Sequence, residues 1–158
     1  MTIKIRRLSH YGYKVDMPKR IDVGDWIDLM SADEVKLEKG EYTMIPLGIA
    51  VELPKGYEAV VVPRSSTFRR HRVLLANSFG VIDNKYCGNF DEWQFPAICM
   101  AEETKIPAGT RIAQFRVQLS QFATPWQKIK WLFTRKINIV EVDVLTNTGR
   151  GGFGSTGN

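Results

Sequence analysis

The sequence predicts an all-β protein, a single domain built as a distorted jelly roll or β-sandwich. Short segments that are apolar, or that alternate apolar and polar residues, follow one another and are separated by turns rich in Gly, Pro, Asp and Asn. That pattern is typical of half-buried, mainly antiparallel strands, and helical periodicity is scarce. With 158 residues, 44% of them hydrophobic, the chain suits one domain at 1–145 followed by a tail at 146–158.

The strands are predicted in order along the chain. The first alternates isoleucine with basic residues, and the others are short apolar or alternating runs. The longest contains Pro46 and Gly48, which interrupt regular pairing, so we expect it to bend there. Two turns, at 53–57 and 106–110, combine a Pro that fixes φ with a Gly that supplies a positive φ. The predicted strands are 2–8, 35–37, 42–53, 57–62, 73–76, 93–100, 111–119 and 137–145.

The segment 120–136 breaks this pattern and is predicted to be a short helical insertion. Thr124 can cap a helix, Pro125 fits the first helical position, and Gln127 stands where the partner of a capping box belongs. Helix is therefore expected here, between two predicted strands.

The insertion is predicted to be amphipathic. Trp126, Ile129 and Phe133 recur at helical spacing and share one face. Such a face has to be covered, and two alternatives stay open: it packs on the β-surface of its own subunit, or it docks another protein. The basic residues are expected to remain in solvent: Lys128, Arg135 and Lys136.

The tail 146–158 is rich in glycine and has little apolar surface to offset its ordering entropy. Glycine lets main-chain N–H groups approach phosphate closely, and Arg150 can add a bidentate contact. The tail has the chemistry of a phosphate clasp, although an unstructured terminus has the same composition. Phe153 supports the interpretation as a phosphate clasp, because its aromatic ring could stack on the base of a bound nucleotide.

Composition bounds the class of protein. The net charge of +5 suits a partner that carries phosphate, either a nucleotide or a nucleic acid, but a basic run is more often a solvated face. Cys87 and Cys99 are expected to be reduced thiols that bind no zinc. No segment is long and apolar enough to cross a membrane or to form a signal peptide. We therefore expect a soluble cytoplasmic protein.

Three further motifs carry groups that can bind a nucleotide. The segment 63–66, Pro-Arg-Ser-Ser, supplies a guanidinium and two hydroxyls after a strand. The segment 80–88 is predicted to be a hairpin with Asp83 and Tyr86 near its tip. The segment 109–114 enters a strand with Arg111 and Gln114 as donors. Each also has a plain structural interpretation, as a turn, a hairpin or an exposed strand.

Taken together and in order, these motifs resemble those of the trimeric all-β dUTP pyrophosphatases (dUTPases), most closely the versions from Gram-positive bacteria and phages. Three departures from the family pattern are Trp26-Ile27 before Asp28, where the family usually has Gly-Tyr, the stretch 89–93, and the insertion 120–136. The five motifs are 24–29, 63–66, 77–88, 109–114 and 150–156.

The resemblance implies hydrolysis of dUTP to dUMP and pyrophosphate in a homotrimer with shared sites. It implies that Asp83 activates the water that attacks the α-phosphorus and that Asp28 holds Mg²⁺ through coordinated water. It assigns contacts with the base and sugar to Asn77, Gly80, Val81, Ile82, Tyr86 and Phe153. It assigns contacts with the phosphates to Arg64, Ser65, Ser66, Gln114, Arg150, Gly152, Ser155 and Thr156.

Three alternatives remain. A dCTP deaminase shares the fold and the Pro-Arg-Ser-Ser loop, but it needs a glutamate that 80–88 lacks. A phage-type regulatory module would bind a repressor-like protein through the dUTPase body or the insertion 120–136, and this can coexist with catalysis. A nucleic-acid binder is the least favoured, since charge alone supports it.

Overall fold

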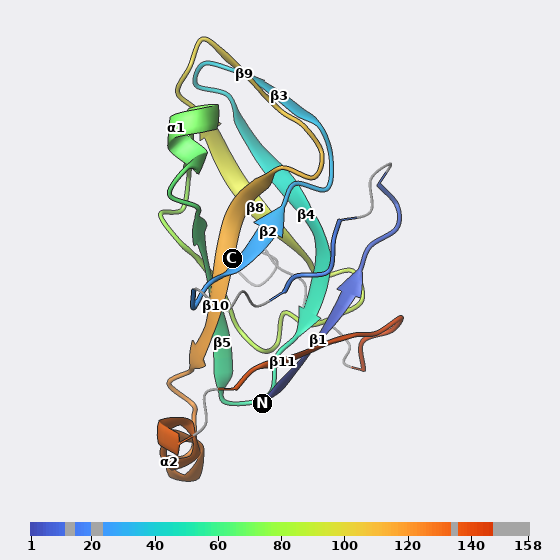
Figure 1. The fold of residues 1–158 in the computed structure, drawn as a ribbon, viewed down its shortest axis with the longest axis vertical. Coiled ribbons are helices and arrows are strands. Elements are labelled where there is room, and N and C mark those ends of the chain that lie inside the picture. Colours follow the sequence, from blue (N-terminus) through green and yellow to red (C-terminus); the bar gives the residue numbers. More distant parts are fainter. Residues whose placement is uncertain (12–14, 20–23, 134–135, 147–158) are drawn as a thin grey trace, which may run out of the picture.

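The computed structural model describes residues 1–11, 15–19, 24–133 and 136–146. Within them the chain is mostly strand, with two short helices (Figure 1). The elements are β1 (Thr2–Arg7), β2 (Ile27–Met30), β3 (Val35–Glu38), β4 (Tyr42–Glu52), β5 (Tyr57–Pro63), α1 (Thr67–His71), β6 (Val73–Leu75), β7 (Gly80–Ile82), β8 (Glu92–Cys99), β9 (Glu103–Ile106), β10 (Arg111–Leu119), α2 (Pro125–Phe133) and β11 (Asn138–Glu141).

Two sheets form the body of the fold. One has the order β11-β1-β4-β8-β6 and the other the order β2-β10-β5-β7, while β3 and β9 make a separate two-stranded ribbon at one end (Figure 1). All of these pairs are antiparallel except β1 with β11, which is parallel. Strand neighbours that are not consecutive in sequence characterise a jelly roll, so the predicted fold class is confirmed.

The core lies between the two sheets and follows from the alternation of the strands. Alternate residues of β1, such as Ile3 and Ile5, are fully buried. Trp93 of β8 and Phe115 of β10 meet edge to face with ring centroids 5.1 Å apart. Since the two strands belong to different sheets, this aromatic contact ties the sheets together.

The long strand β4 bends where its sequence predicts. Its register with β8 shifts between Pro46 and Ala50, and Gly48 has φ +67°. A Cβ at Gly48 would lie 2.8 Å from the Cβ of Ala32, closer than any real side chain tolerates. Glycine is therefore required both by the conformation and by the close approach of the neighbouring chain.

Most predicted strands are confirmed, with ends that differ by a few residues. The predictions missed β2, β9 and α1, all short, and β11 ends at Glu141 rather than at 145. The predicted hairpin at 80–88 is wrong. Instead, β7 pairs with β5, and the chain passes from its end through a loop into β8 of the other sheet.

Helix α2 confirms the predicted insertion. The capping box is present: the Thr124 N–H donates to Gln127 Oε1 at 2.8 Å, and the Gln127 N–H donates to Thr124 Oγ1 at 3.3 Å. Figure 1 shows α2 beyond one end of β5 and β10, away from both sheets. None of the helices in the described ranges is long and apolar enough to cross a membrane.

Of the two alternatives for the amphipathic face, the structure contradicts packing on the chain's own β-surface. Trp126 is 73% exposed and Phe133 82% exposed, and Ile129 is also exposed. The helix instead attaches through its other side, where Trp131 packs on Tyr57 with ring centroids 5.6 Å apart. On the same side, Gln127 Nε2 donates to the Lys55 carbonyl at 2.8 Å, so the face with three apolar residues points outward.

Candidate functional site

Asp28, Gln114 and the Pro-Arg-Ser-Ser loop meet on three adjacent strands. Asp28 of β2 stands opposite Gln114 of β10, and Gln114 stands opposite Val62 of β5, two residues before Arg64. Antiparallel partners that face each other directly lie about 5 Å apart. Three sequence motifs are thereby placed in one row across the sheet.

Two guanidinium groups surround the Asp28 carboxylate. Arg64 Nε lies 2.7 Å from Asp28 Oδ1, and Arg111 Nη1 lies 3.5 Å from Asp28 Oδ2. The Asp28 side chain is only 19% exposed, so the carboxylate is held in a mainly protein environment and screened weakly by solvent. The arrangement leaves a net positive charge at the surface, which suits an anionic ligand.

The loop 63–66 is supported by bonds to β10. The buried Thr67 hydroxyl donates to the Ile112 carbonyl at 2.6 Å, and the Arg64 N–H donates to the same carbonyl at 3.3 Å. Ser66 stands at the N-cap of α1 without a side-chain capping bond, and Ser65 is exposed. The hydroxyls of the loop are thus presented on a fixed main chain and are not used to cap the helix.

Asp83 lies in a tight turn directly after β7. Its Oδ1 accepts the Lys85 N–H at 2.6 Å, and its carbonyl accepts the Tyr86 N–H at 3.2 Å. Such a turn is typical of aspartate, whose side chain can bond the main chain two residues on. The bond from the Lys85 N–H therefore fixes the orientation of the Asp83 carboxylate relative to the main chain of the turn.

Tyr86 is anchored by its hydroxyl. It donates to the Glu92 carbonyl at 2.8 Å. Burial, with help from the negative charges of Asp91 and Glu92, raises the pKa of Tyr86 to about 12. The phenol is therefore neutral near pH 7 and acts as a fixed apolar ring, not as an acid or base.

The other predicted base and sugar positions that the structure describes lie on strand β7 or just before it. Strand β7 is the edge strand of its sheet within the described residues, so one side of its main chain pairs with β5 and the other faces outward. Val81 is 56% exposed and Asn77 is exposed. A cleft of about 1150 Å³ opens beside the turn that follows β7. Its lining includes Asn84 and Lys85 of that turn and residues of the insertion 120–136.

The two groups of site residues do not meet within one chain. Ile82 stands opposite Ala59 near the start of β5, whereas Arg64 follows the end of β5. At about 3.3 Å per residue, Asp83 and Arg64 are separated by roughly 15–20 Å. Within one copy of this fold, Asp83 and Arg64 therefore do not lie next to each other.

The chemistry of Asp28 fits an indirect magnesium ligand. No cluster of three metal-binding side chains occurs among the residues that the structure describes. Mg²⁺ needs no such cluster, because it keeps several waters and is held by one or two carboxylates together with substrate phosphates. Since both Asp28 oxygens face guanidinium groups, contact through a coordinated water suits this site better than direct coordination.

Some predicted residues lie outside the described part of the chain, namely Arg150, Gly152, Phe153, Ser155 and Thr156. Arg111, which the sequence offers as a donor but to which the resemblance assigns no contact, lies beside Asp28. Its place three residues before Gln114, on the same strand and in the same motif, is the signal available in the sequence.

Known proteins resemble this chain in sequence and in fold. A model of the dUTPase family matches residues 16–157. The SPbeta prophage-derived deoxyuridine 5'-triphosphate nucleotidohydrolase YosS of Bacillus subtilis (strain 168) is 44% identical over 157 residues, which cover 99% of both chains. The structure of the dUTPase from Streptococcus mutans has a TM-score of 0.68 at 23% identity and covers 77% of this chain and 98% of that one. A mutant dUTPase from phage phi11 of S. aureus, described as coordinating a structural Mg(II) ion, has a TM-score of 0.65 at 22% identity, with coverages of 79% and 94%.

Proposed function

The chain belongs to the dUTPase family, and from this premise we propose that it hydrolyses dUTP to dUMP and pyrophosphate. The observation that carries the proposal is the row of Asp28, Gln114 and the loop 63–66 across adjacent strands. This row offers guanidinium, amide and hydroxyl donors around one carboxylate. These are the groups that a triphosphate with a bound cation requires.

Asp83 is the catalytic base. Its carboxylate accepts a proton from the water that attacks the α-phosphorus, and the bond from that phosphorus to the bridging oxygen breaks as pyrophosphate leaves. The turn that bonds Asp83 Oδ1 to the Lys85 N–H fixes the side chain for this role. Donors elsewhere in the site stabilise the negative charge that builds up on the phosphate.

Arg64, Ser65, Ser66 and Gln114 bind the phosphates, and Asp28 holds Mg²⁺ through water. The ion, when bound, neutralises charge that develops on the phosphate oxygens. Arg111 belongs to the same set, since its guanidinium lies beside the Asp28 carboxylate. Arg64 and Arg111 also orient that carboxylate through their ion pairs with it.

The edge strand β7 selects the base. The outward main-chain groups of Gly80, Val81 and Ile82 can bond the donor and acceptor edge of uracil, and Asn77 lines the same position. The amino group of cytosine would face another donor, and leaving buried polar groups unpaired makes this discrimination steep. The ring of Tyr86 stands beneath the sugar and excludes a 2′-OH.

The glycine-rich tail closes the site. Arg150, Gly152, Ser155 and Thr156 bind the terminal phosphate, and Phe153 stacks on uracil. The composition of the tail supports this role, because glycine permits close approach to phosphate and the other side chains supply donors.

The active enzyme is a homotrimer whose sites are shared between subunits. The separation of Asp83 from Arg64 along β5 supports this, since one site needs both groups. Mixing Asp83→Asn subunits with Arg64→Ala subunits after mild dissociation tests it. Shared sites predict recovered activity, because some sites in mixed trimers combine two intact groups, whereas sites within one chain predict none.

Pyrophosphate release measured side by side with dUTP, dCTP, dTTP and UTP tests the proposed reaction. Hydrolysis of dUTP should exceed that of each other nucleotide by several orders of magnitude. Deamination of dCTP in the same assay, or equal hydrolysis of all four, would refute the proposal. A salt-dependent gel shift with DNA addresses the nucleic-acid alternative.

A second function, binding of a repressor-like protein, is favoured by one specific observation, the exposed face of α2. Trp126 and Phe133 project there from a helix that is fixed on its other side by Trp131. Exposed aromatic side chains on a rigid helix are typical of docking sites. Pull-down from a host lysate with the wild-type chain and with Trp126→Ala/Phe133→Ala tests this function. Equal capture by both proteins would refute it.

A further inference from the structure

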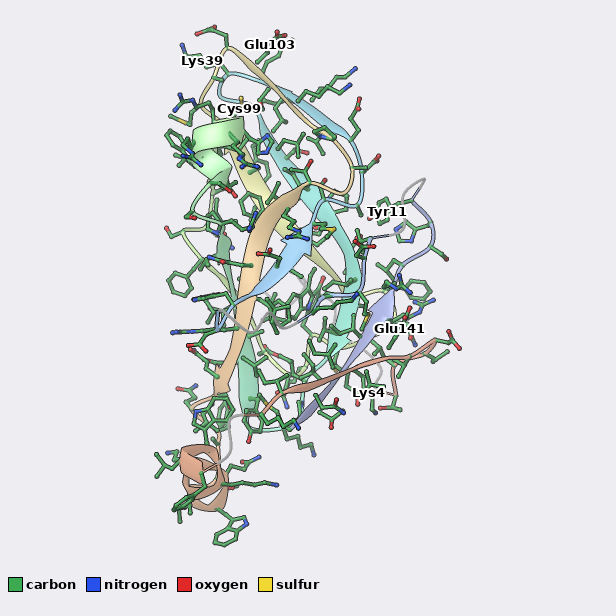
Figure 2. All side chains as sticks on the ribbon, in the orientation of Figure 1. Lys4, Tyr11, Lys39, Cys99, Glu103 and Glu141 are labelled. Atoms are coloured by element: carbon green, nitrogen blue, oxygen red, sulfur yellow. The ribbon has the colours of Figure 1, made fainter. Side chains whose placement is uncertain are left out.

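Glu92, the first residue of β8, is held by its side chain as well as by its strand. Its Oε1 accepts the Gly48 N–H at 2.8 Å, and its Oε2 accepts the Tyr11 hydroxyl. Gly48 lies in β4, and Figure 2 shows Tyr11 in the segment that follows β1. One half-buried carboxylate thus joins three segments that are far apart in the sequence.

The bond to Gly48 belongs to the bulge of β4. Glu92 stands opposite Ala50 and Gln94 stands opposite Pro46, so residues 47–49 of β4 face Trp93 alone. A bulge leaves main-chain groups out of the strand ladder, and the Glu92 carboxylate accepts one of them, the Gly48 N–H. Because the acceptor is charged, this bond is stronger than one between neutral groups. The start of β8 is therefore fastened to the bulge.

The bond to Tyr11 fixes Glu92 from the other side. Burial, together with the bond to Glu92 and the charge of its carboxylate, raises the pKa of Tyr11, so the phenol stays protonated and donates at neutral pH. The segment after β1 also bonds the bulge directly, since the Leu8 N–H donates to the Gly48 carbonyl at 2.9 Å. Tyr11, Gly48 and Glu92 therefore form one connected network, in which each bond supports the others.

The same network determines where the ring of Tyr86 lies. The Tyr86 hydroxyl donates to the main-chain carbonyl of Glu92 at 2.8 Å, and the Tyr86 N–H donates to the Asp83 carbonyl at 3.2 Å. The ring is thus held at its hydroxyl end by residue 92 and at its main chain by the turn after β7. A shift of Glu92 moves the acceptor of the hydroxyl, and the ring moves with it.

We propose that Glu92 is a positioning residue that makes the site reject ribonucleotides, acting through Tyr86. This deepens the proposed function and rests on it, because Tyr86 is the residue proposed to exclude a 2′-OH. A pocket rejects an added hydroxyl only weakly when its walls can yield, so exclusion by contact requires a ring that cannot shift. The Glu92 carboxylate supplies that rigidity from outside the nucleotide site.

The test is the ratio of kcat/KM for dUTP to kcat/KM for UTP. Glu92→Ala removes both side-chain bonds, and the ratio should fall roughly five- to tenfold, the scale of one net hydrogen bond. Tyr11→Phe removes one bond and leaves Glu92 in place, so the ratio should fall about two- to fivefold. Glu92→Gln keeps an oxygen that can accept the Gly48 N–H, and it should retain a higher ratio than Glu92→Ala.

The competing explanation is that Glu92 only stabilises the fold, and two further measurements separate the alternatives. Glu41→Ala is the matched control, because it removes a carboxylate that accepts the Glu38 N–H at 2.9 Å beside the other end of β4. Its ratio should equal that of the wild type, whatever its Tm. In a Tyr86→Phe background the hydroxyl that contacts residue 92 is gone, so adding Glu92→Ala should not lower the ratio further.

A binding readout independent of turnover is calorimetry with the non-hydrolysable imido analogues of dUTP and UTP. The preference of Glu92→Ala for the deoxy analogue should fall by the same factor as its kcat/KM ratio. An unchanged ratio in Glu92→Ala would overturn the inference, as would an equal further loss in the Tyr86→Phe background. If Glu92→Ala does not fold, an unchanged ratio in Tyr11→Phe overturns it. The proposed reaction is judged separately, by dUTP hydrolysis in the wild type and its loss in Asp83→Asn.

Discussion

Replacing Asp83 by Asn should abolish most catalysis while leaving the fold intact. An amide oxygen can still accept the Lys85 N–H that Asp83 Oδ1 accepts at 2.6 Å, so the turn after β7 is retained. The amide cannot take a proton from water. Loss of a positioned general base costs about 10² to 10⁴ in rate, so kcat should fall by at least that factor with dUTP binding largely unchanged.

The assay is pyrophosphate release at saturating dUTP, with binding of the imido analogue measured by calorimetry. Asp83→Ala serves as the comparison, because it loses the base and the bond to Lys85 together. Loss of that bond should cost about 0.5–1.5 kcal/mol, or a few degrees in Tm, which Asp83→Asn should not show. Turnover by Asp83→Asn within tenfold of the wild type would refute the assignment of the base.

Three other changes give measurable outcomes. Replacing 120–136 by a Gly/Ser linker should lower the free energy of unfolding by only about 1–3 kcal/mol and retain dUTP hydrolysis. The reason is that the replacement removes little apolar packing beyond the contact of Trp131 with Tyr57. Loss of the folded protein, measured by circular dichroism, would contradict this. Gly48→Ala should lower the free energy of unfolding by about 2–4 kcal/mol, because strain at φ +67° adds to the 2.8 Å approach of the new Cβ to Ala32. An unchanged midpoint of urea unfolding would contradict this prediction. Glu52 has a lowered pKa when folded, so its stabilisation is present above its ordinary value of 4.5 and is lost as pH falls through the folded pKa. The Tm of Glu52→Gln should accordingly lie below that of the wild type at neutral pH and converge with it in acid; a gap that is independent of pH would show that ionisation of Glu52 is not involved.

The sequence predicts strands well where burial alternates and turns are marked by Pro and Gly. Strand β10 has the predicted ends, and the bend of β4 falls at Pro46 and Gly48. The missed strand β2 is only four residues long and carries Asp28. Its pairing with β10 decides its conformation, and no local pattern reveals a long-range partner.

The hairpin at 80–88 is a wrong prediction for a similar reason. An apolar arm, a polar tip and a glycine are typical of a hairpin, but the partner of β7 is β5, which lies some twenty residues earlier in the chain. The same register places Asp83 far from Arg64. Motifs can therefore be identified from sequence one by one, while their division into two separate groups follows only from the pairing of strands.

The outward face of α2 shows what spacing alone cannot decide. Helical periodicity identifies the residues that share a face, but not which face meets the sheet. Gln127 Nε2 donates to the Lys55 carbonyl at 2.8 Å, and this bond together with Trp131 directs the opposite side inward. Polar contacts at the start of a short helix thus override the larger apolar stripe.

Two of the departures from the family pattern, the stretch 89–93 and the insertion 120–136, differ in how they attach to the fold, and this predicts different consequences. In the stretch 89–93, Asp91 accepts the Gly88 N–H, and Asn89 accepts the N–H of Leu145, which directly precedes the tail 146–158. The insertion contacts the body through Gln127 and Trp131, whereas the large apolar side chains on its other face are exposed. Substitutions in 89–93 should therefore alter turnover, because they move Tyr86, which belongs to the proposed nucleotide site. Substitutions on the exposed face of α2 should alter association with other proteins and leave kcat unchanged, because the side chains on that face point into solvent and do not support the residues that bind the nucleotide.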